Sequence, residues 1–534
     1  MITLRSYAAG RWMEGKGDLA TLVNPATEEP LARAGTGGID MAAVLEHART
    51  VGGPALRGMT FAERGARLRA ATDALQAHRN ELLDLAVANG GNTRGDAKFD
   101  VDGAIFTLAA YADIGKALGA TRVLVDGEGV TLGRSPRFHG QHIQVTRTGA
   151  AIHINAFNFP AWGMAEKAAA ALLAGMPVVS KPATSSAMVA HRMMEILVEA
   201  RALPEGALSL LAGSSGDLLE HVGPFDVVAF TGSSDTGAQI RSMRQVIENS
   251  VRVNVEADSL NAAVLGPDAE PGSETWDYFV KDVLRDMTQK AGQKCTAIRR
   301  VLVPAEHADR LRDDLVDRLQ GVTVGNPANE GVRMGPVATA AQLADVRAGV
   351  DQIARDGRLV FGRGAVKPVG APEGKGFFTS PVLVEVEPGA PAPTVHSREV
   401  FGPVATVVPY TGKPADAAEI VGRGRGGLVS SIYSEDVGFT ADLVLGVAPF
   451  HGRVFLGSAK IAEASPGPGT VLPLLVHGGP GRAGGGEELG GLRGLALYMQ
   501  RVALEGSRPV IERIVIKQGG AAPHPPDPPL VAPK

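Results

Sequence analysis

The sequence predicts an α/β fold built on a parallel sheet with helices on both faces. From Ala150 onward, short apolar stretches alternate with helical ones, and this alternation is typical of parallel sheets. The chain is 534 residues long, which exceeds the roughly 250–300 residues at which a single hydrophobic core stops growing. We therefore expect two or three domains.

The composition excludes several function classes. The 53 basic and 57 acidic residues give a formal charge of −4, which gives no support for binding nucleic acid or an anionic membrane surface. The single cysteine excludes an intrachain disulfide framework and zinc sites of several thiolates, and it fits a reducing compartment. Residues 1–10 lack the apolar core of a signal peptide, and the apolar stretch 168–179 is too short to span a bilayer. We expect a cytoplasmic protein that binds neither nucleic acid nor membrane.

The first 150 residues predict helices followed by a β arm. Residues 41–50, 61–89 and 99–118 carry apolar residues at helical spacing, with two helices in the second stretch. Residues 121–150 alternate apolar and polar residues in three short runs, which predicts strands solvated on one face. We interpret 121–150 as an arm that pairs with another subunit, and a surface meander is the alternative.

Small polar residues and one lysine follow the carboxyl ends of successive predicted strands. These strands are 151–154, 177–180, 208–211, 227–230 and 251–255, and the residues beyond the first four are Asn158, Lys181 to Thr184, Gly213 to Gly216, and Thr231 to Ser233. Ligands of parallel sheets bind at this edge, and a helix predicted to begin near Ala238 could present N–H groups to a phosphate. We predict a dinucleotide site here, although the Gly-x-Gly-x-x-Gly fingerprint is absent and any one of these turns is more often only a turn.

A second αβ unit is predicted over 261–460, and less regular segments follow it. We expect a flexible glycine-rich loop at 476–490, a helix at 492–503, an edge strand at 510–517 and a disordered tail at 519–534.

Two residues are candidates for chemistry. Cys295 lies among small and polar neighbours and could act as a thiolate nucleophile, whereas the alternative is an inert core thiol. Glu256 ends a predicted strand near the same cleft and could act as a general base, whereas the alternative is a solvated or capping acid. The basic residues that would favour the thiolate are Lys290, Lys294, Arg299 and Arg300.

A set of short motifs runs through about residues 20–505. In chain order they are Asn24-Pro25-Ala26-Thr27, Asn158-Phe159-Pro160, Lys181-Pro182, Phe230-Thr231-Gly232-Ser233, Glu256, Gly292-Gln293-Lys294-Cys295 and Glu399-Val400-Phe401-Gly402-Pro403, with the glycine-rich loop last. Together they resemble the aldehyde dehydrogenase superfamily. The resemblance implies a Rossmann-like dinucleotide-binding domain (1–120 and 151–260), an α/β catalytic domain (261–460), a β oligomerisation arm (121–150 and 495–518) and a homodimer.

Three stretches, 256–261, 295–300 and 477–482, resemble a narrower group within that superfamily. The group comprises the dehydrogenase half of the bifunctional ring-opening enzyme of phenylacetyl-CoA degradation and its stand-alone relatives. The resemblance implies oxidation of a CoA-linked semialdehyde to the acid, with 3,4-dehydroadipyl-CoA semialdehyde from benzoyl-CoA degradation as the expected substrate. A CoA-acylating dehydrogenase and a catalytically silent nucleotide-binding homologue are the alternatives.

The resemblance also implies residue roles. Cys295 would attack the aldehyde carbon, Asn158 would stabilise the oxyanion, and Glu256 would activate the water that hydrolyses the resulting thioester. The implied cofactor-binding residues are Ile154, Asn155, Phe157, Lys181, Ala183, Thr184, Ser214, Thr231, Gly232, Ser233, Thr236, Glu399 and Phe401. Of these, Glu399 would hold the nicotinamide ribose and Phe401 would pack beside the ring. No metal is expected.

Two departures from the family pattern bear on cofactor and base. NAD-preferring members usually carry a glutamate where this chain has Thr184, and a carboxylate would repel a 2′-phosphate that a hydroxyl beside Lys181 would bind. We therefore expect NADP. The usual Glu-Leu-Gly-Gly-Lys is replaced by Glu256-Ala257-Asp258-Ser259, so we expect a differently shaped backbone behind the base.

Overall fold

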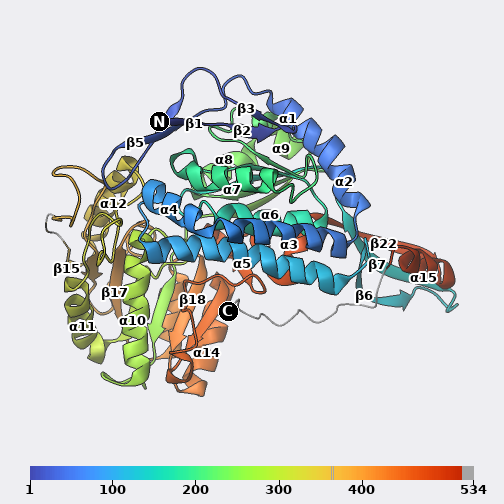
Figure 1. Cartoon of the computed structure of the whole chain (residues 1–534). Coiled ribbons are helices and arrows are strands. Elements are labelled where there is room, and N and C mark those ends of the chain that lie inside the picture. The colour runs from blue at the N-terminus through green and yellow to red at the C-terminus, as the bar shows by residue number, and fades with distance from the viewer. Residues whose placement is uncertain (363, 365, 520–534) are drawn as a thin grey trace.

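Two seven-stranded sheets organise the protein, described by a computed structural model over residues 1–362, 364 and 366–519 (Figure 1). The first sheet has the order β12-β11-β8-β9-β10-β2-β3, and the strands from β8 to β12 pair in parallel. Its strands are Ser6–Ala8 (β2), Arg11–Met13 (β3), Ala151–Ile154 (β8), Val178–Lys181 (β9), Leu208–Leu210 (β10), Val227–Thr231 (β11) and Arg252–Glu256 (β12). The α/β prediction and the five predicted strands are confirmed.

The second sheet is parallel except at its β15 edge, and its order is β15-β16-β17-β14-β13-β18-β19. Its strands are Ala262–Leu265 (β13), Arg300–Pro304 (β14), Arg358–Phe361 (β15), Val382–Glu385 (β16), Val404–Tyr410 (β17), Gly427–Tyr433 (β18) and His451–Gly457 (β19). Alternate residues enter two cores: Val301 and Val303 face α10 and α11, and Leu302 faces α12, α13 and α14. These helices are Glu274–Thr288 (α10), Ala308–Gln320 (α11), Ala340–Ile353 (α12), Pro414–Gly422 (α13) and Val437–Val447 (α14).

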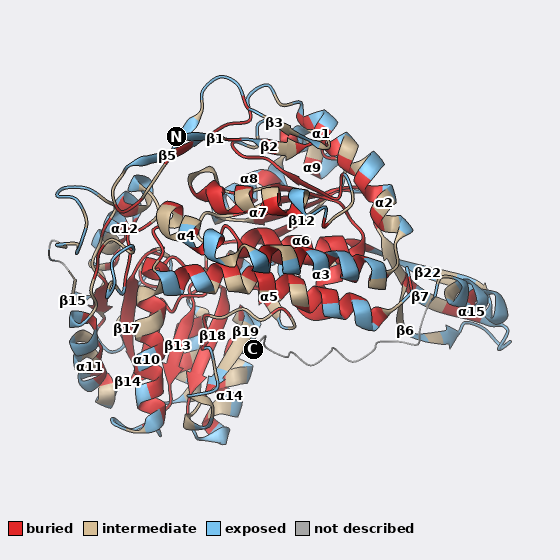
Figure 2. Ribbon diagram, in the orientation of Figure 1, coloured by how far each residue is buried: buried red, intermediate tan, exposed pale blue. Residues whose placement is uncertain are grey.

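Among the described residues, nine α-helices accompany the first sheet. They are Met41–His47 (α1), Gly53–Gly58 (α2), Phe61–Ala77 (α3), Arg79–Gly90 (α4), Arg94–Leu118 (α5), Trp162–Ala174 (α6), Ala187–Glu199 (α7), Ser234–Ser242 (α8) and Arg244–Glu248 (α9). Every residue of α6 is buried, because α3 and α5 cover it (Figure 2). The helix predicted near Ala238 begins earlier, at Ser234, because the Ser233 hydroxyl caps it by accepting a hydrogen bond from the Thr236 N–H.

The predicted arm is a three-stranded antiparallel sheet that projects from the body (Figure 1). It contains Leu124–Thr131 (β6), Phe138–Thr146 (β7) and Met499–Ser507 (β22). The helix predicted at 492–503 is present only in its first half: a 3-10 helix spans Gly491–Leu497, and β22 follows because β7 offers a long pairing edge. The edge strand predicted at 510–517 is also wrong. That segment is the helix Arg508–Lys517 (α15), and Pro509 suits its first turn because proline has no N–H to donate to a ladder.

Three further observations complete the fold. Ile2–Leu4 (β1), Ala20–Val23 (β4) and Pro30–Ala34 (β5) form a small sheet that the sequence did not predict, because runs this short carry no readable period. The loop predicted at 476–490 contains a hairpin, Val476–Gly478 (β20) with Glu487–Leu489 (β21). The predicted tail lies outside the described residues from 520 onward. Within the described ranges, no helix has both the length and the apolar character needed to cross a bilayer.

Candidate active site

Cys295 follows a tight turn between α10 and β14. Lys290, Ala291 and Gly292 have φ angles of 53°, 51° and 68°, all in the left-handed region. A Cβ on Gly292 would lie 2.1 Å from the carbonyl oxygen of Gly402, so glycine lets this turn touch the loop ahead of β17. The turn places Cys295 beside the carboxyl end of β12.

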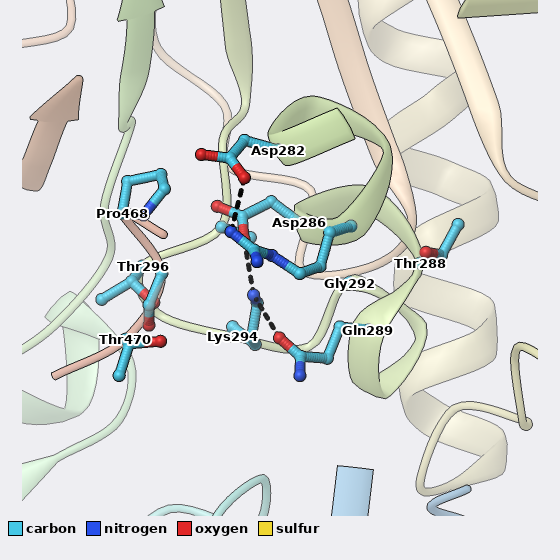
Figure 3. Close-up of polar contacts among 12 residues, drawn as sticks. Asp282, Asp286, Thr288, Gln289, Gly292, Lys294, Thr296, Pro468 and Thr470 are labelled. Atoms are coloured by element: carbon cyan, nitrogen blue, oxygen red, sulfur yellow. Dashed lines mark hydrogen bonds and ion pairs between the residues drawn. The ribbon is translucent and has the colours of Figure 1, made fainter. Parts of the chain in front are cut away.

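Buried polar contacts hold the chain on both sides of this cysteine (Figure 3). The Lys294 Nζ donates to Asp286 Oδ1 at 2.6 Å and to Gln289 Oε1 at 2.9 Å. Both charged side chains are almost completely buried, at 1% and 0% exposure. On the other side, the Thr296 hydroxyl donates to the carbonyl oxygen of Gly469 at 2.8 Å. The nucleophile candidate is therefore anchored by both of its neighbours.

The basic residues near Cys295 have partners of their own. Arg299 donates to three carbonyl oxygens and lies 3.6 Å from Glu399, and Arg300 donates to three other carbonyl oxygens. Burial raises the pKa of the Cys295 thiol well above its usual value, and nearby carboxylates, Glu256 foremost, raise it further. The basic residues that flank Cys295 in the sequence therefore do not outweigh burial and the carboxylates, and a base has to remove the proton of the thiol.

Glu256 and His477 meet at the sulfur of Cys295. The His477 Nε2 lies 3.1 Å from Glu256 Oε1 and 3.9 Å from Cys295 Sγ. Burial raises the pKa of Glu256, but His477, Lys167 and the thiol together outweigh it and bring that pKa to about 2. The carboxylate is therefore ionised. The Trp162 ring packs edge-on against the imidazole at 5.7 Å and fixes its plane.

A glycine-rich hairpin delivers two of these side chains. His477 on β20 and Glu488 on β21 are directly opposite each other in the antiparallel pair, so they share a face. A Cβ on Gly484 would lie 2.2 Å from the carbonyl oxygen of Val255, and the Gly486 N–H donates to the same oxygen. These glycines let the hairpin lie against β12, beside the carboxylate at its end.

A buried charge cluster lies behind Glu256. The Lys167 Nζ lies 2.6 Å from Glu166 Oε1 and 3.3 Å from Glu488 Oε2. Burial raises the pKa of both of these glutamates. Glu166, Glu256 and Glu488 bring carboxylate oxygens within 4.8 Å of one another, but the ammonium among them favours proton storage over a metal ion. Neither this cluster nor His477 could be assigned a role from the sequence, because a lone acid or histidine on a helix or loop does not reveal its neighbours.

Asn158 lies beside Glu256 and Cys295. Its Nδ2 donates to the carbonyl oxygen of Gln293 at 3.0 Å, and because an amide carries two N–H bonds, the second can donate to an oxyanion. A small cavity of about 10 Å³, the space of roughly one water, is lined by Asn158, Glu256 and Cys295 together. The three predicted catalytic residues thus converge.

An apolar channel of about 570 Å³ leads to Cys295. Phe99 and Phe106 of α5, Phe159 and Trp162 line it opposite the segment 466–472. The Phe159 ring contacts those of Phe99 and Trp162 edge-on, at 5.7 and 5.8 Å between centroids. The volume is typical of a small-molecule site, and aromatic walls suit an extended carbon chain.

The predicted cofactor residues line one edge of the first sheet. Ile154, Asn155 and Phe157 end or follow β8, Lys181, Ala183 and Thr184 end or follow β9, Ser214 follows β10, and Thr231, Gly232, Ser233 and Thr236 end or follow β11. β8 and β11 are neighbours where the strand order reverses, which is where parallel sheets bind ligands. The N-terminus of α8 lies there too, and Asp258 accepts a hydrogen bond from the Ser234 N–H at 3.2 Å.

Lys181 carries a charge without a protein counterion. It is half-buried, burial lowers its pKa, and no ion pair joins it among the residues that the structure describes. Thr184 follows at the start of a short turn, Thr184–Ser186. An enclosed ammonium without an anionic partner fits a phosphate group of the cofactor.

Glu399 and Phe401 reach this edge from the second sheet. Ser259 donates its N–H to Glu399 Oε2 at 2.9 Å, and burial raises the pKa of Glu399 to about 7. The Phe401 ring lies edge-on to Phe157 at 5.9 Å. The unusual Asp258-Ser259 pair after Glu256 therefore holds the start of α8 and the Glu399 carboxylate in place.

The chain is similar to known proteins of one family. Residues 12–447 match the model of the aldehyde dehydrogenase family. The chain is 50% identical over 478 residues to the 3,4-dehydroadipyl-CoA semialdehyde dehydrogenase of Aromatoleum evansii. The aligned residues cover 89% of this chain and 93% of that protein. Among solved structures, a lactaldehyde dehydrogenase matches with a TM-score of 0.81 at 25% identity, over 95% of this chain and 99% of that one. An NADP-dependent enzyme of E. coli matches with a TM-score of 0.80 at 23% identity, over 95% and 98%.

Proposed function

Because the chain belongs to the aldehyde dehydrogenase family, we propose that it oxidises a CoA-linked semialdehyde to the carboxylic acid with NADP as the hydride acceptor. The observation that carries the proposal is the convergence of Cys295, Glu256 and Asn158 at the inner end of an apolar channel. The expected substrate is 3,4-dehydroadipyl-CoA semialdehyde, because the name of the relative at 50% identity contains it.

The three residues have distinct parts in this reaction. The Cys295 sulfur attacks the aldehyde carbon, and the Asn158 side chain with the Cys295 backbone N–H stabilises the oxyanion of the thiohemiacetal. A nicotinamide supplies, when bound, the acceptor for the hydride that leaves this carbon. Glu256 then takes a proton from water in the small cavity, and the water hydrolyses the thioester on Cys295.

Hydrolysis rather than transfer to CoA is favoured by the position of Glu256. The carboxylate shares the small cavity with the nucleophile, and that cavity has the space of roughly one water, so a base and its water would lie beside the thioester. The product is therefore the free acid. A CoA-acylating enzyme would require added CoA.

Lys181 and Thr184 are proposed to hold the 2′-phosphate of NADP. The half-buried ammonium has no protein counterion among the described residues, and position 184 offers a hydroxyl in place of a carboxylate. Glu399 would accept hydrogen bonds from the nicotinamide ribose, and Phe401 would pack beside the ring. The remaining cofactor residues lie along the same sheet edge.

The domain and subunit organisation is proposed as the family implies. Segments 1–120 and 151–260 bind the dinucleotide, and 261–460 carries Cys295. The arm, 121–150 and 495–518, pairs with a second copy to form a homodimer. Exposed apolar side chains on the arm support this pairing, namely Val130, Leu132, Phe138, Val502 and Val510.

A substrate panel tests the function. Free and CoA-linked semialdehydes of increasing chain length are each assayed with NAD and with NADP, without added CoA. We expect the highest kcat/KM for a CoA-linked semialdehyde with NADP, and a free acid as product. Turnover only with added CoA would identify an acylating enzyme, and cofactor binding without turnover would identify a silent homologue.

A further inference from the structure

We propose that His477 is the base that takes the proton of the Cys295 thiol, which leaves Glu256 to activate water. The inference concerns a step of the proposed aldehyde oxidation and therefore rests on it. The sequence placed His477 only in a motif and assigned it no chemistry.

The geometry brings one imidazole nitrogen to both partners. The His477 Nε2 is 3.9 Å from Cys295 Sγ and 3.1 Å from Glu256 Oε1, and the imidazole is only 1% exposed. Cross-strand pairing in the hairpin and the edge of the Trp162 ring hold the imidazole in this orientation. A proton can therefore pass from sulfur to nitrogen without movement of the backbone.

Glu256 is the rival base, and the contacts of the sulfur distinguish the two. Cys295 Sγ has the His477 Nε2 as a partner at 3.9 Å, and the same nitrogen lies 3.1 Å from the Glu256 carboxylate, which would stabilise the imidazolium that forms. A base that is oriented by a third group in this way is the arrangement that activates a nucleophilic thiol, and Glu256 then acts on water.

The wider electrostatic environment is consistent with this role. The titratable and charged groups that face His477 or Cys295 are Glu256 on β12, Glu166 and Lys167 on α6, Glu488 on β21, Arg453 on β19, Arg299 ahead of β14 and Glu399 ahead of β17. Lys167 is paired with Glu166 and Glu488, so the His477 imidazole is the basic group in contact with the sulfur.

The proton balance closes over one turnover. The thiol proton moves to the His477 Nε2 as the Sγ–C bond forms, and the carbonyl π electrons move to the oxygen. The hydride and its electron pair leave that carbon for the oxidised nicotinamide dinucleotide, which is reduced, and the carbon becomes a thioester. Glu256 takes a proton from the attacking water, the C–S bond breaks, and His477 returns its proton to the departing sulfur. Glu256 then releases its proton to solvent, which is the one proton that the overall reaction produces.

Alkylation by iodoacetamide tests the step on the whole enzyme without any aldehyde. Cys295 is the only cysteine in the chain, so the alkylation rate reports on this thiol alone. Rates are measured from pH 5 to 10 for wild type, H477Q, H477N and E256Q. H191Q is the matched control, because His191 is another buried histidine, 6% exposed, remote from the site. Thermal melting shows which variants are folded.

We expect H477Q and H477N to be alkylated about tenfold more slowly than wild type near pH 7, with the deficit closing at high pH where the thiol ionises unaided. E256Q and H191Q should be alkylated at least as fast as wild type. Stopped flow with an aldehyde that the enzyme oxidises follows the formation of reduced cofactor. E256Q should keep a rapid burst of reduced cofactor and lose steady-state turnover, whereas the burst should be slower in the His477 variants.

Superimposable alkylation profiles for wild type and both folded His477 variants would overturn the proposal. The same holds if E256Q, rather than H477Q, slows alkylation, because Glu256 would then be the base. If no aldehyde is oxidised at all, the proposed function fails, yet the alkylation profiles still decide the role of His477.

Discussion

Replacing Lys294 with methionine removes the ammonium from a buried ion pair next to the nucleophile. The Nζ lies 2.6 Å from Asp286 Oδ1, and the two side chains are 1% and 0% exposed. Methionine keeps most of the apolar stem and removes the charge. Asp286 Oδ2 has no hydrogen-bond partner among the described residues, so Lys294 is the cation that contacts this carboxylate directly, while Arg299 and Arg453 act on it from farther away.

The magnitude follows from the geometry. Two unit charges 2.6 Å apart attract by about 6 kcal/mol at an effective dielectric constant of 20. Desolvation of both charges offsets much of that attraction, but removing one partner leaves the other buried and uncompensated, which costs about 3–5 kcal/mol. We therefore expect K294M to lower the free energy of unfolding by about 3–5 kcal/mol.

Urea unfolding at fixed protein concentration, followed by tryptophan fluorescence, measures this loss. D286N and the double variant K294M/D286N complete the cycle. Because the double variant leaves no lone buried charge, it should cost at least about 2 kcal/mol less than the sum of the single losses. A K294M loss below about 1 kcal/mol, or additive losses in the double variant, would refute a compensating ion pair at this position.

Three further predictions follow from the site. Gly484→Ala should lower kcat about tenfold or more, because its Cβ would lie 2.2 Å from the Val255 carbonyl oxygen and push the hairpin off β12. Gly485 also has a positive φ, but no described atom lies within 4 Å of a Cβ at that position. Gly485→Ala should therefore keep its activity. Equal losses in the two variants would assign the effect to backbone strain. Burial raises the pKa of Glu399 to about 7, above its unfolded value, so the native state binds the extra proton and stability falls as pH rises through about 4.5–7. Glu399→Gln should flatten this fall in urea midpoints measured at pH 4.5 and 7.5, and an unchanged fall would exclude Glu399 as its source. Thr184→Glu should lower kcat/KM for NADP by about tenfold and spare NAD, and an unchanged preference would remove position 184 from cofactor choice.

The class of the fold was predictable because its signals are local. Strand-to-helix alternation after Ala150 reports burial and backbone preference within a few residues, and each predicted strand of the first sheet is present. Cys295, Glu256 and Asn158 were identifiable by the short motifs that contain them. The C-terminal segment shows the limit of such signals. The pattern of 492–517 fits either helix or strand, and pairing with β7 decided that β22 is a strand.

The sequence by itself determined the α/β class, the family resemblance and the identity of the nucleophile candidate. Only the tertiary structure decided what surrounds that nucleophile. His477 is 182 positions from Cys295, and it reaches the sulfur because glycines let its hairpin lie against β12. The flanking lysine, which in the sequence is only a source of charge, is paired with Asp286 and compensated. Charge and hydrogen-bond partners arise from the packing of distant segments, so a local pattern does not contain them.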